Sequence, residues 1–264
     1  MTAPDHPLVS IVVIGRNEGE RLVRCLQSIA RITPGPHRIE TIYVDSASTD
    51  GSAARAAQLG ARVVEIQPQR PCAAVGRNAG WRQARGEYVL FLDGDTILHP
   101  DFFARALEAL RDPATAVAWG HRRELAPVQS LYVRVLDLDW IYPPGPSEFC
   151  GGDALMRRQV LEQVGGFDEA LIAGEEPDMC RRIRERGHSI LHIDAPMTLH
   201  DLAIRDFGAY WKRAFRAGYA YADVAHRFQG TGDPLWLREA QRNVVHGALL
   251  LCAPLAMAGA MATP

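Results

Sequence analysis

Two aspartates separated by one glycine follow an apolar run in residues 89–96, which read VLFLDGDT. Four apolar residues without a polar interruption are typical of a strand buried on both faces of a parallel sheet. Because open α/β sheets bind ligands at the carboxyl ends of their strands, Asp93 and Asp95 can offer oxygen ligands to Mg²⁺ or Mn²⁺, with Gly94 leaving room for a phosphate. The alternative is an acidic turn, since Asp-Gly is a common turn dipeptide.

A second acidic group, Glu175-Glu176-Pro177-Asp178, opens a predicted helix that runs to about residue 186. Proline suits the first helical position, which puts Glu176 at or near the N-cap. The helix dipole stabilises acidic residues in a first turn, so capping alone explains this group as well as a chemical role does.

The elements around residues 89–96 alternate between strand and helix. Apolar runs predict strands at 8–14, 39–44, 62–66 and 87–92, with helices at 20–30, 52–59 and 73–84 between them. This alternation implies right-handed βαβ crossovers and a parallel sheet. Polar residues follow three of these strands, so we expect Asn17, Glu18, Asp45 and the two aspartates to share one rim. The first strand is followed by GRNEGE rather than G-x-G-x-x-G, which argues against a dinucleotide site.

The second half of the chain is less regular. We expect helices at 100–110 and 157–164 and strands at 114–119 and 189–194. The segment 121–150 is rich in proline and aromatic residues, and it is either a lid or acceptor wall, or an ordered surface excursion.

The C-terminal region carries two features that bear on membranes. A helix predicted at 206–221 places aromatic residues beside Lys212, Arg213 and Arg216, which suits either a membrane interface or core packing with a solvated basic edge. Residues 244–262 are nearly all apolar, and they predict either membrane contact or a helix buried on the domain or a partner.

Composition limits the function further. The chain has 264 residues and a net charge of −2, which gives no electrostatic reason to expect nucleic acid as a partner. Lys212 is the only lysine, so a P-loop is excluded. Five scattered cysteines favour a reducing compartment, and the N-terminus shows no signal-peptide pattern. We therefore expect a cytoplasmic protein, with possible attachment to the inner face of a membrane through 205–264.

Several segments, in order, resemble motifs of the family 2 glycosyltransferases. SIVVIGRNEG resembles the opening strand and Asn-Glu turn, and YVDSASTDGS the Asp-containing second segment. GRNAGWRQARGEYVLFLDGDT is similar to the Arg-Asn helix that leads to the Asp-x-Asp strand, and CGGDALMRR, VGGFDE and GEEPDMCRRIRERGHSI continue the series. The resemblance, over about residues 9–200, implies an α/β fold of GT-A type with a mixed, mainly parallel sheet flanked by helices.

The resemblance also implies a domain plan. Residues 1–204 would be the glycosyltransferase domain, with a nucleotide-binding half at 1–96 and an acceptor-binding half at 97–204. Residues 205–264 would be a helical extension.

On the donor side, the resemblance implies that a nucleoside-diphosphate sugar, with uridine expected as the base, lies against one set of residues. That set is Ile14, Asn17, Glu18, Asp45, Arg77, Asp93, Gly94, Gly152 and Asp153. The divalent ion would be held by Asp95, with His200 and Asp93 as further ligands.

For catalysis, the resemblance implies a single in-line displacement with inversion, in which a carboxylate takes the proton of the acceptor hydroxyl. Glu176 stands where the family typically has Asp, so it is the expected base, with Glu175 and Asp178 as alternatives. The acceptor would be a polysaccharide, lipid-linked or related molecule. The other functions considered are a catalytically silent sugar-nucleotide-binding subunit of a polysaccharide assembly machine and a sugar-phosphate nucleotidyltransferase.

Overall fold

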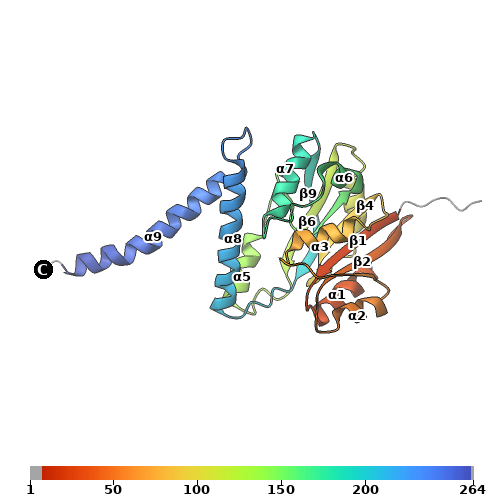
Figure 1. The fold of residues 1–264 in the computed structure, drawn as a ribbon, viewed down its shortest axis with the longest axis horizontal. Helices are drawn as coiled ribbons and strands as arrows, with labels where there is room; N and C mark the ends of the chain where they lie inside the picture. Colours follow the sequence, from red (N-terminus) through yellow and green to blue (C-terminus); the bar gives the residue numbers. More distant parts are fainter. Residues whose placement is uncertain (1–7, 263–264) are drawn as a thin grey trace, which may run out of the picture. The chain divides into compact units, whose positions relative to one another are not determined.

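The computed structural model describes residues 8–262, with side chains as far as Leu250 and at Cys252. The chain divides into two compact units, Met1–Tyr210 and Trp211–Pro264. The first unit contains the mixed α/β sheet, and the second consists of helix (Figure 1).

Across residues 8–262, nine strands form one sheet in the order β3-β2-β1-β4-β8-β6-β9-β5, with β7 paired to β9. The strands are β1 (Leu8–Gly15), β2 (Arg38–Ser46), β3 (Arg62–Ile66), β4 (Tyr88–Asp93), β5 (Thr96–Leu98), β6 (Thr115–Glu124), β7 (Gly145–Pro146), β8 (Ala154–Arg157) and β9 (Ser189–His200). The first four strands are parallel, whereas β8 runs antiparallel to both β4 and β6. The fold is thus a mixed, mainly parallel sheet, as predicted.

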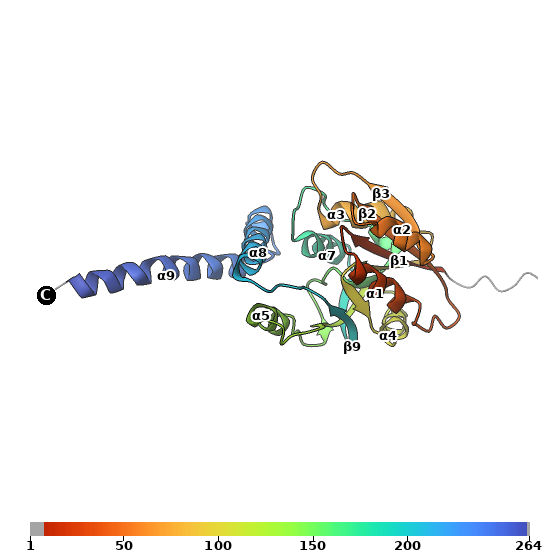
Figure 2. The ribbon, with the colours of Figure 1, turned by 90° about the horizontal axis from the view of Figure 1, so that it is seen from below.

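The helices flank this sheet or extend from it. They are α1 (Glu20–Ile29), α2 (Ser52–Gln58), α3 (Ala73–Trp81), α4 (Phe102–Ala109), α5 (Leu131–Asp139), α6 (Arg158–Val164), α7 (Glu175–Glu185), α8 (Phe207–Phe228) and α9 (Leu237–Ala262). The order of strands reverses after β3, so right-handed crossovers put α3 on the face opposite α1 and α2. Figure 2 shows the flanking helices from below the view of Figure 1.

The core lies between the buried strands and these helices. The apolar run of β1 is almost completely buried, and so are Val89, Leu90, Phe91 and Leu92 of β4. Helix α3 approaches the sheet closely because Gly80 has no side chain: a Cβ there would lie 2.3 Å from Val12 Cγ1. This close approach holds α3 against the face of β1 and β2, since the same Cβ would lie 3.0 Å from Val44 Cγ2.

Four strands differ from the sequence expectations. Strands β6 and β9 continue to Glu124 and His200, beyond the predicted ends at 119 and 194, because they pair with each other along their length. The short strands β5 and β8 were not predicted. Segment 121–150 is ordered and contains α5, with Ser130 as its N-cap.

The C-terminal helices leave part of the sequence prediction open. The predicted apolar tail falls within α9, but the side chains at 251 and 253–262 lie outside the described residues. Among the described residues, no helix is both long and apolar enough to cross a membrane.

Candidate active site

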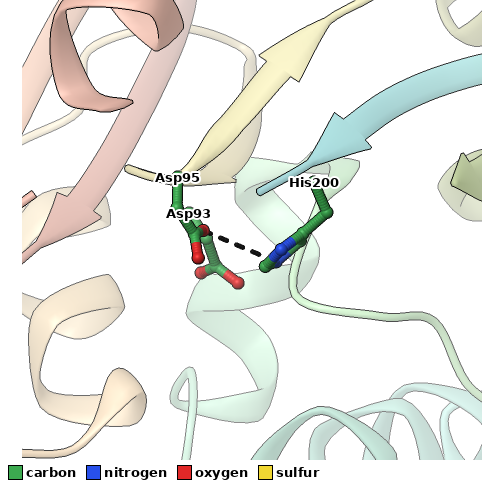
Figure 3. Close-up of side chains that lie close together, drawn as sticks. All are labelled: Asp93, Asp95 and His200. Carbon is green, nitrogen blue, oxygen red and sulfur yellow. Dashed lines mark ion pairs between the residues drawn. The ribbon is translucent and has the colours of Figure 1, made fainter. Parts of the chain in front are cut away.

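Asp93, Asp95 and His200 converge at one edge of the sheet (Figure 3). One ligand atom from each lies within 4.8 Å of the others, and His200 Nε2 is 3.5 Å from Asp95 Oδ1. The strand register explains this meeting, because Thr96 of β5 pairs with His200 at the end of β9. The Asp95 carbonyl also accepts the N–H of Asp201 at 3.0 Å.

The electrostatics of this cluster favour a cation. Burial raises the pKa of Asp95 to about 8, and the negative charges of Asp93 and Glu18 add to the effect. Burial also acts to raise the pKa of Asp93, but Arg77 and then His200 outweigh it, so the net shift is downward. Two carboxylates and an imidazole form a donor set that suits Mn²⁺ or Mg²⁺, and such an ion would take the place of the Asp95 proton. The three residues therefore fit a divalent metal.

Arg77 joins this cluster to the acidic start of α7. Its side chain is 2% exposed, and it donates to Asp93 Oδ1 at 2.9 Å and to Glu175 Oε1 at 2.8 Å. Its Nη1 also lies 3.0 Å from Glu176 Oε1. One guanidinium cannot neutralise three carboxylates, and burial together with Glu176 raises the pKa of Glu175 to about 7.

The three acidic residues of α7 differ in what they face. The Glu175 side chain is 4% exposed and that of Glu176 is 17% exposed, and both contact Arg77. Asp178 instead binds Arg182 at 2.7 Å, and Arg182 also donates to the carbonyl of Gly166. Asp178 is therefore occupied in tying α7 to the loop after α6, and it does not join the cluster.

The rim predicted for the nucleotide side is present. Ile14 pairs with Asp93 across β1 and β4, and Asp45, one residue before the end of β2, pairs with Gly15. The Asp45 carboxylate is 2% exposed and accepts the Tyr43 hydroxyl at 3.0 Å.

The loops after β1 and β2 are tied together at this rim. Asn17 Oδ1 accepts the N–H of Thr49 at 2.8 Å, and the Asn17 N–H is bonded to Ser48 Oγ. Glu18 forms an ion pair with Arg21 at 2.8 Å. Burial raises the pKa of Glu18 against the opposing effect of that arginine.

The two predicted glycines serve the protein's own packing. A Cβ on Gly94 would lie 3.0 Å from the Ile14 carbonyl and 3.1 Å from Glu18 Cγ. Close packing against β1 and the loop after it thus favours glycine at 94, and the role predicted for Gly94 toward a phosphate stays a prediction. A Cβ on Gly152 would lie 2.2 Å from Arg77 Nη2, so glycine is required there for the arginine to fit.

Asp153 holds the strand that carries Asp93 through hydrogen bonds from its carboxylate. Its Oδ1 accepts the N–H of Asp93 at 3.0 Å, and its Oδ2 accepts the Thr198 hydroxyl at 2.8 Å. The carboxylate is fully buried, and burial with the nearby Asp93 charge raises its pKa to about 6. Both oxygens are thus used to link β4 to β9.

Sequence reasoning missed Arg122, Trp140 and Thr198. The Arg122 guanidinium carbon lies 4.5 Å from the Trp140 ring centroid, and the Trp140 and His200 rings are 5.2 Å apart. The high aromatic content of 121–150 was the only signal for Trp140, and nothing in the local sequence distinguishes Arg122 from its neighbour Arg123.

Family models give an independent view of the chain. The model of glycosyl transferase family 2 matches residues 10–165, more than half of the chain, and that of glycosyl transferase family group 2 matches residues 88–262.

Two curated relatives cover most of the chain. Glycosyltransferase AglE of Haloferax volcanii is 23% identical over 243 residues, which are 83% of this chain and 74% of the relative. The pre-mycofactocin glycosyltransferase of Mycobacterium tuberculosis is 27% identical over 253 residues, or 89% of this chain. The chain spans about half of that second relative, 51% of its length.

Solved structures show the same fold. The mannosyltransferase PcManGT from Pyrobaculum calidifontis, in complex with GDP-Man and Mn²⁺, has a TM-score of 0.73 at 22% identity, covering 99% of this chain and 77% of that one. Staphylococcus aureus TarS 1-349, in complex with UDP-GlcNAc, has a TM-score of 0.62 at 15% identity, with coverages of 84% and 73%. The first unit thus has the GT-A type of fold.

Proposed function

The chain belongs to glycosyl transferase family 2, and from this we propose that it is an inverting, metal-dependent glycosyltransferase. It would move a sugar from a nucleoside-diphosphate sugar to a hydroxyl of a polysaccharide, lipid-linked or related acceptor. The observation that carries the proposal is the metal-competent cluster of Asp93, Asp95 and His200, linked through Arg77 to the acidic start of α7.

In this proposal the donor lies along the rim formed by the ends of β1, β2 and β4. Asp45 would contact the nucleotide base, Asp93 would hold the ribose or join the metal ligands, and Arg77 would face the base or the phosphates. A divalent ion bound at the cluster would offset the charge that grows on the leaving diphosphate.

Glu176 is the proposed general base. A base must touch the acceptor hydroxyl, and Glu176 is the more exposed of the two glutamates that contact Arg77. Its carboxylate would take the hydroxyl proton while the oxygen attacks the anomeric carbon from the face opposite the leaving diphosphate, which inverts that carbon. Glu175, buried deeper, would hold Arg77 in place.

The identity of the donor is best approached by a ligand screen. Uridine is the expected base, but solved neighbours were crystallised with GDP-Man and with UDP-GlcNAc, so both nucleotides belong in the screen. We expect one nucleoside-diphosphate sugar with Mn²⁺ to raise the melting temperature, because a ligand that binds only the folded state stabilises it in proportion to its affinity.

Turnover tests the proposal directly. The selected donor with Mn²⁺ should be consumed slowly by transfer to water, releasing a sugar of inverted anomeric configuration that NMR detects immediately after release. A retained configuration would contradict inversion. Binding of the donor without any turnover would favour the catalytically silent subunit instead.

We further propose peripheral attachment to the inner face of a membrane through residues 205–264. Four aromatic side chains spaced four residues apart on α8 are each more than half exposed: Phe207, Trp211, Phe215 and Tyr219. Basic residues at 212, 213 and 216 lie beside them in sequence. Exposed aromatic residues with a basic flank suit an anionic lipid surface better than core packing.

Vesicle flotation tests this attachment. The full chain should float with vesicles that contain phosphatidylglycerol and less with pure phosphatidylcholine. Trp211→Ala with Phe215→Ala should weaken the binding, whereas Leu59→Ala, an exposed apolar residue of the sheet unit, should not. Equal recovery of the double variant and the wild-type chain would refute a role for α8.

A further inference from the structure

Arg122 is a half-buried cation whose N–H groups have no protein acceptor within the described part of the chain. It lies near the end of β6, where it pairs with Thr198 of β9. The adjacent Arg123 binds Asp137 through two nitrogens, and Arg77 is surrounded by three carboxylates. Arg122 therefore differs from its neighbours in having its hydrogen-bonding capacity unused.

Two contacts hold the Arg122 guanidinium in place. Its carbon lies 4.5 Å from the ring centroid of Trp140, and a Cβ on Gly151 would lie 3.0 Å from its Nη1. The Arg122 side chain thus packs against the Trp140 ring and the backbone of Gly151. Burial is the largest influence on the pKa of Asp93 and of Asp153, and the Arg122 charge acts against it at both.

A half-buried guanidinium has lost part of its hydration, and an anionic partner can replace what is lost. Its planar fork matches the two oxygens of a phosphate or carboxylate, with which it forms paired hydrogen bonds. The arrangement is that of a binding group whose partner is an oxyanion.

We propose that Arg122 and Trp140 form a subsite for an oxyanion of the acceptor, a phosphate or a carboxylate close to the accepting hydroxyl. This inference rests on the proposed function, in which the donor diphosphate lies at the cluster of Asp93, Asp95 and His200. Trp140 contacts both Arg122 and His200, so the subsite adjoins that cluster. In this proposal the acceptor anion binds at Arg122 while the leaving diphosphate binds at the neighbouring metal cluster.

Calorimetry with inorganic phosphate and with acetate tests the subsite. The full chain is first saturated with Mg²⁺ and UDP, or GDP if that nucleotide binds instead. Each anion is then titrated into the loaded protein, so that phosphate and carboxylate chemistry are measured separately. Arg122→Gln removes the guanidinium, and Arg122→Lys keeps the charge but not the fork. Arg38→Gln is the control, because Arg38 is exposed at the start of β2, at the opposite end of the parallel strands.

We expect one anion to bind the loaded wild-type chain and the Arg38→Gln variant, and to bind Arg122→Gln about tenfold or more weakly, with Arg122→Lys between them. Gly151→Ala provides a second route, because its methyl group would lie 3.0 Å from Arg122 Nη1 and would shift the guanidinium without removing the charge. It should weaken anion binding too, which keeps the test decisive if Arg122→Gln does not fold.

Three results would overturn the inference: no anion binding to the loaded wild-type chain, competition between the anion and the nucleotide, or equal anion affinity in the Arg122 variants. The proposed function is judged separately. If neither UDP nor GDP binds with Mg²⁺, that function fails, whereas titration of the nucleotide-free chain still reports on Arg122.

Discussion

Replacing Arg77 with glutamine should destabilise the first unit strongly. The guanidinium is 2% exposed and is the shared partner of Asp93, Glu175 and Glu176. Removing one member of a buried ion pair costs about 3–5 kcal/mol, because the remaining charges stay buried without a partner. For a unit of some 210 residues, each kcal/mol lowers the melting temperature by about 2–4 °C, so we expect a decrease of about 6–20 °C.

The loss of stability caused by Arg77→Gln should also depend on pH. The pKa of Glu175 is already raised to about 7 with Arg77 beside it, and without the guanidinium the carboxylates should have still higher folded-state pKa values. A group with a raised folded-state pKa contributes stability that is present at low pH and is lost as pH rises through that value. The difference between Arg77→Gln and the wild type should therefore be larger at pH 8 than at pH 5.

Urea unfolding followed by circular dichroism at both pH values measures this difference. Arg82→Gln is the control, because Arg82 directly follows α3 but is 54% exposed and pairs with Glu169 on the surface. Exposed pairs contribute about 0–1 kcal/mol, so the control should unfold nearly like the wild type. The reasoning is wrong if Arg77→Gln matches Arg82→Gln, or if its deficit is larger at pH 5.

Four further predictions concern the cluster and the residues that support it. Asp95→Asn should abolish Mn²⁺-dependent nucleotide binding in calorimetry while Asp101→Asn preserves it. In the wild type, the affinity for the metal ion should rise by up to about tenfold per pH unit from pH 6 to 8. The reason is that the pKa of Asp95 is about 8 and the ion must displace the Asp95 proton. An affinity that does not change with pH would contradict Asp95 as a metal ligand. Glu176→Gln should retain donor binding while transfer falls by about 10²-fold or more, and wild-type rates would place the base elsewhere. Gly152→Ala should lower the free energy of unfolding in urea by about 1–3 kcal/mol, because the new methyl group would collide with Arg77 Nη2. The loss should be smaller in a chain that also carries Arg77→Gln, which lacks that nitrogen. If the losses of the two single variants simply add in the double variant, the predicted collision is refuted.

Local sequence patterns were sufficient to predict the strands of the parallel half of the sheet. Strands β1 to β4 are rich in apolar residues and are followed by polar turns, and helix α1 carries apolar residues at helical spacing. They could not reveal β8 or β5, because strands of four and three residues carry too little pattern and exist through pairing with β4, β6 and β9. Similarly, β9 extends to His200 only because β6 and β5 accompany it.

By itself, the sequence determined the family, the rim of polar residues and the set of carboxylates from which a site could be built. It did so because strand ends and glycine turns are local features, which can be recognised from residues that are adjacent in the sequence. Only the tertiary structure decided what the buried carboxylates contact: Asp153 links two strands, and Arg77 reaches Glu175, 98 residues away. Such pairings depend on close packing between distant segments, and no local pattern encodes the distance between them.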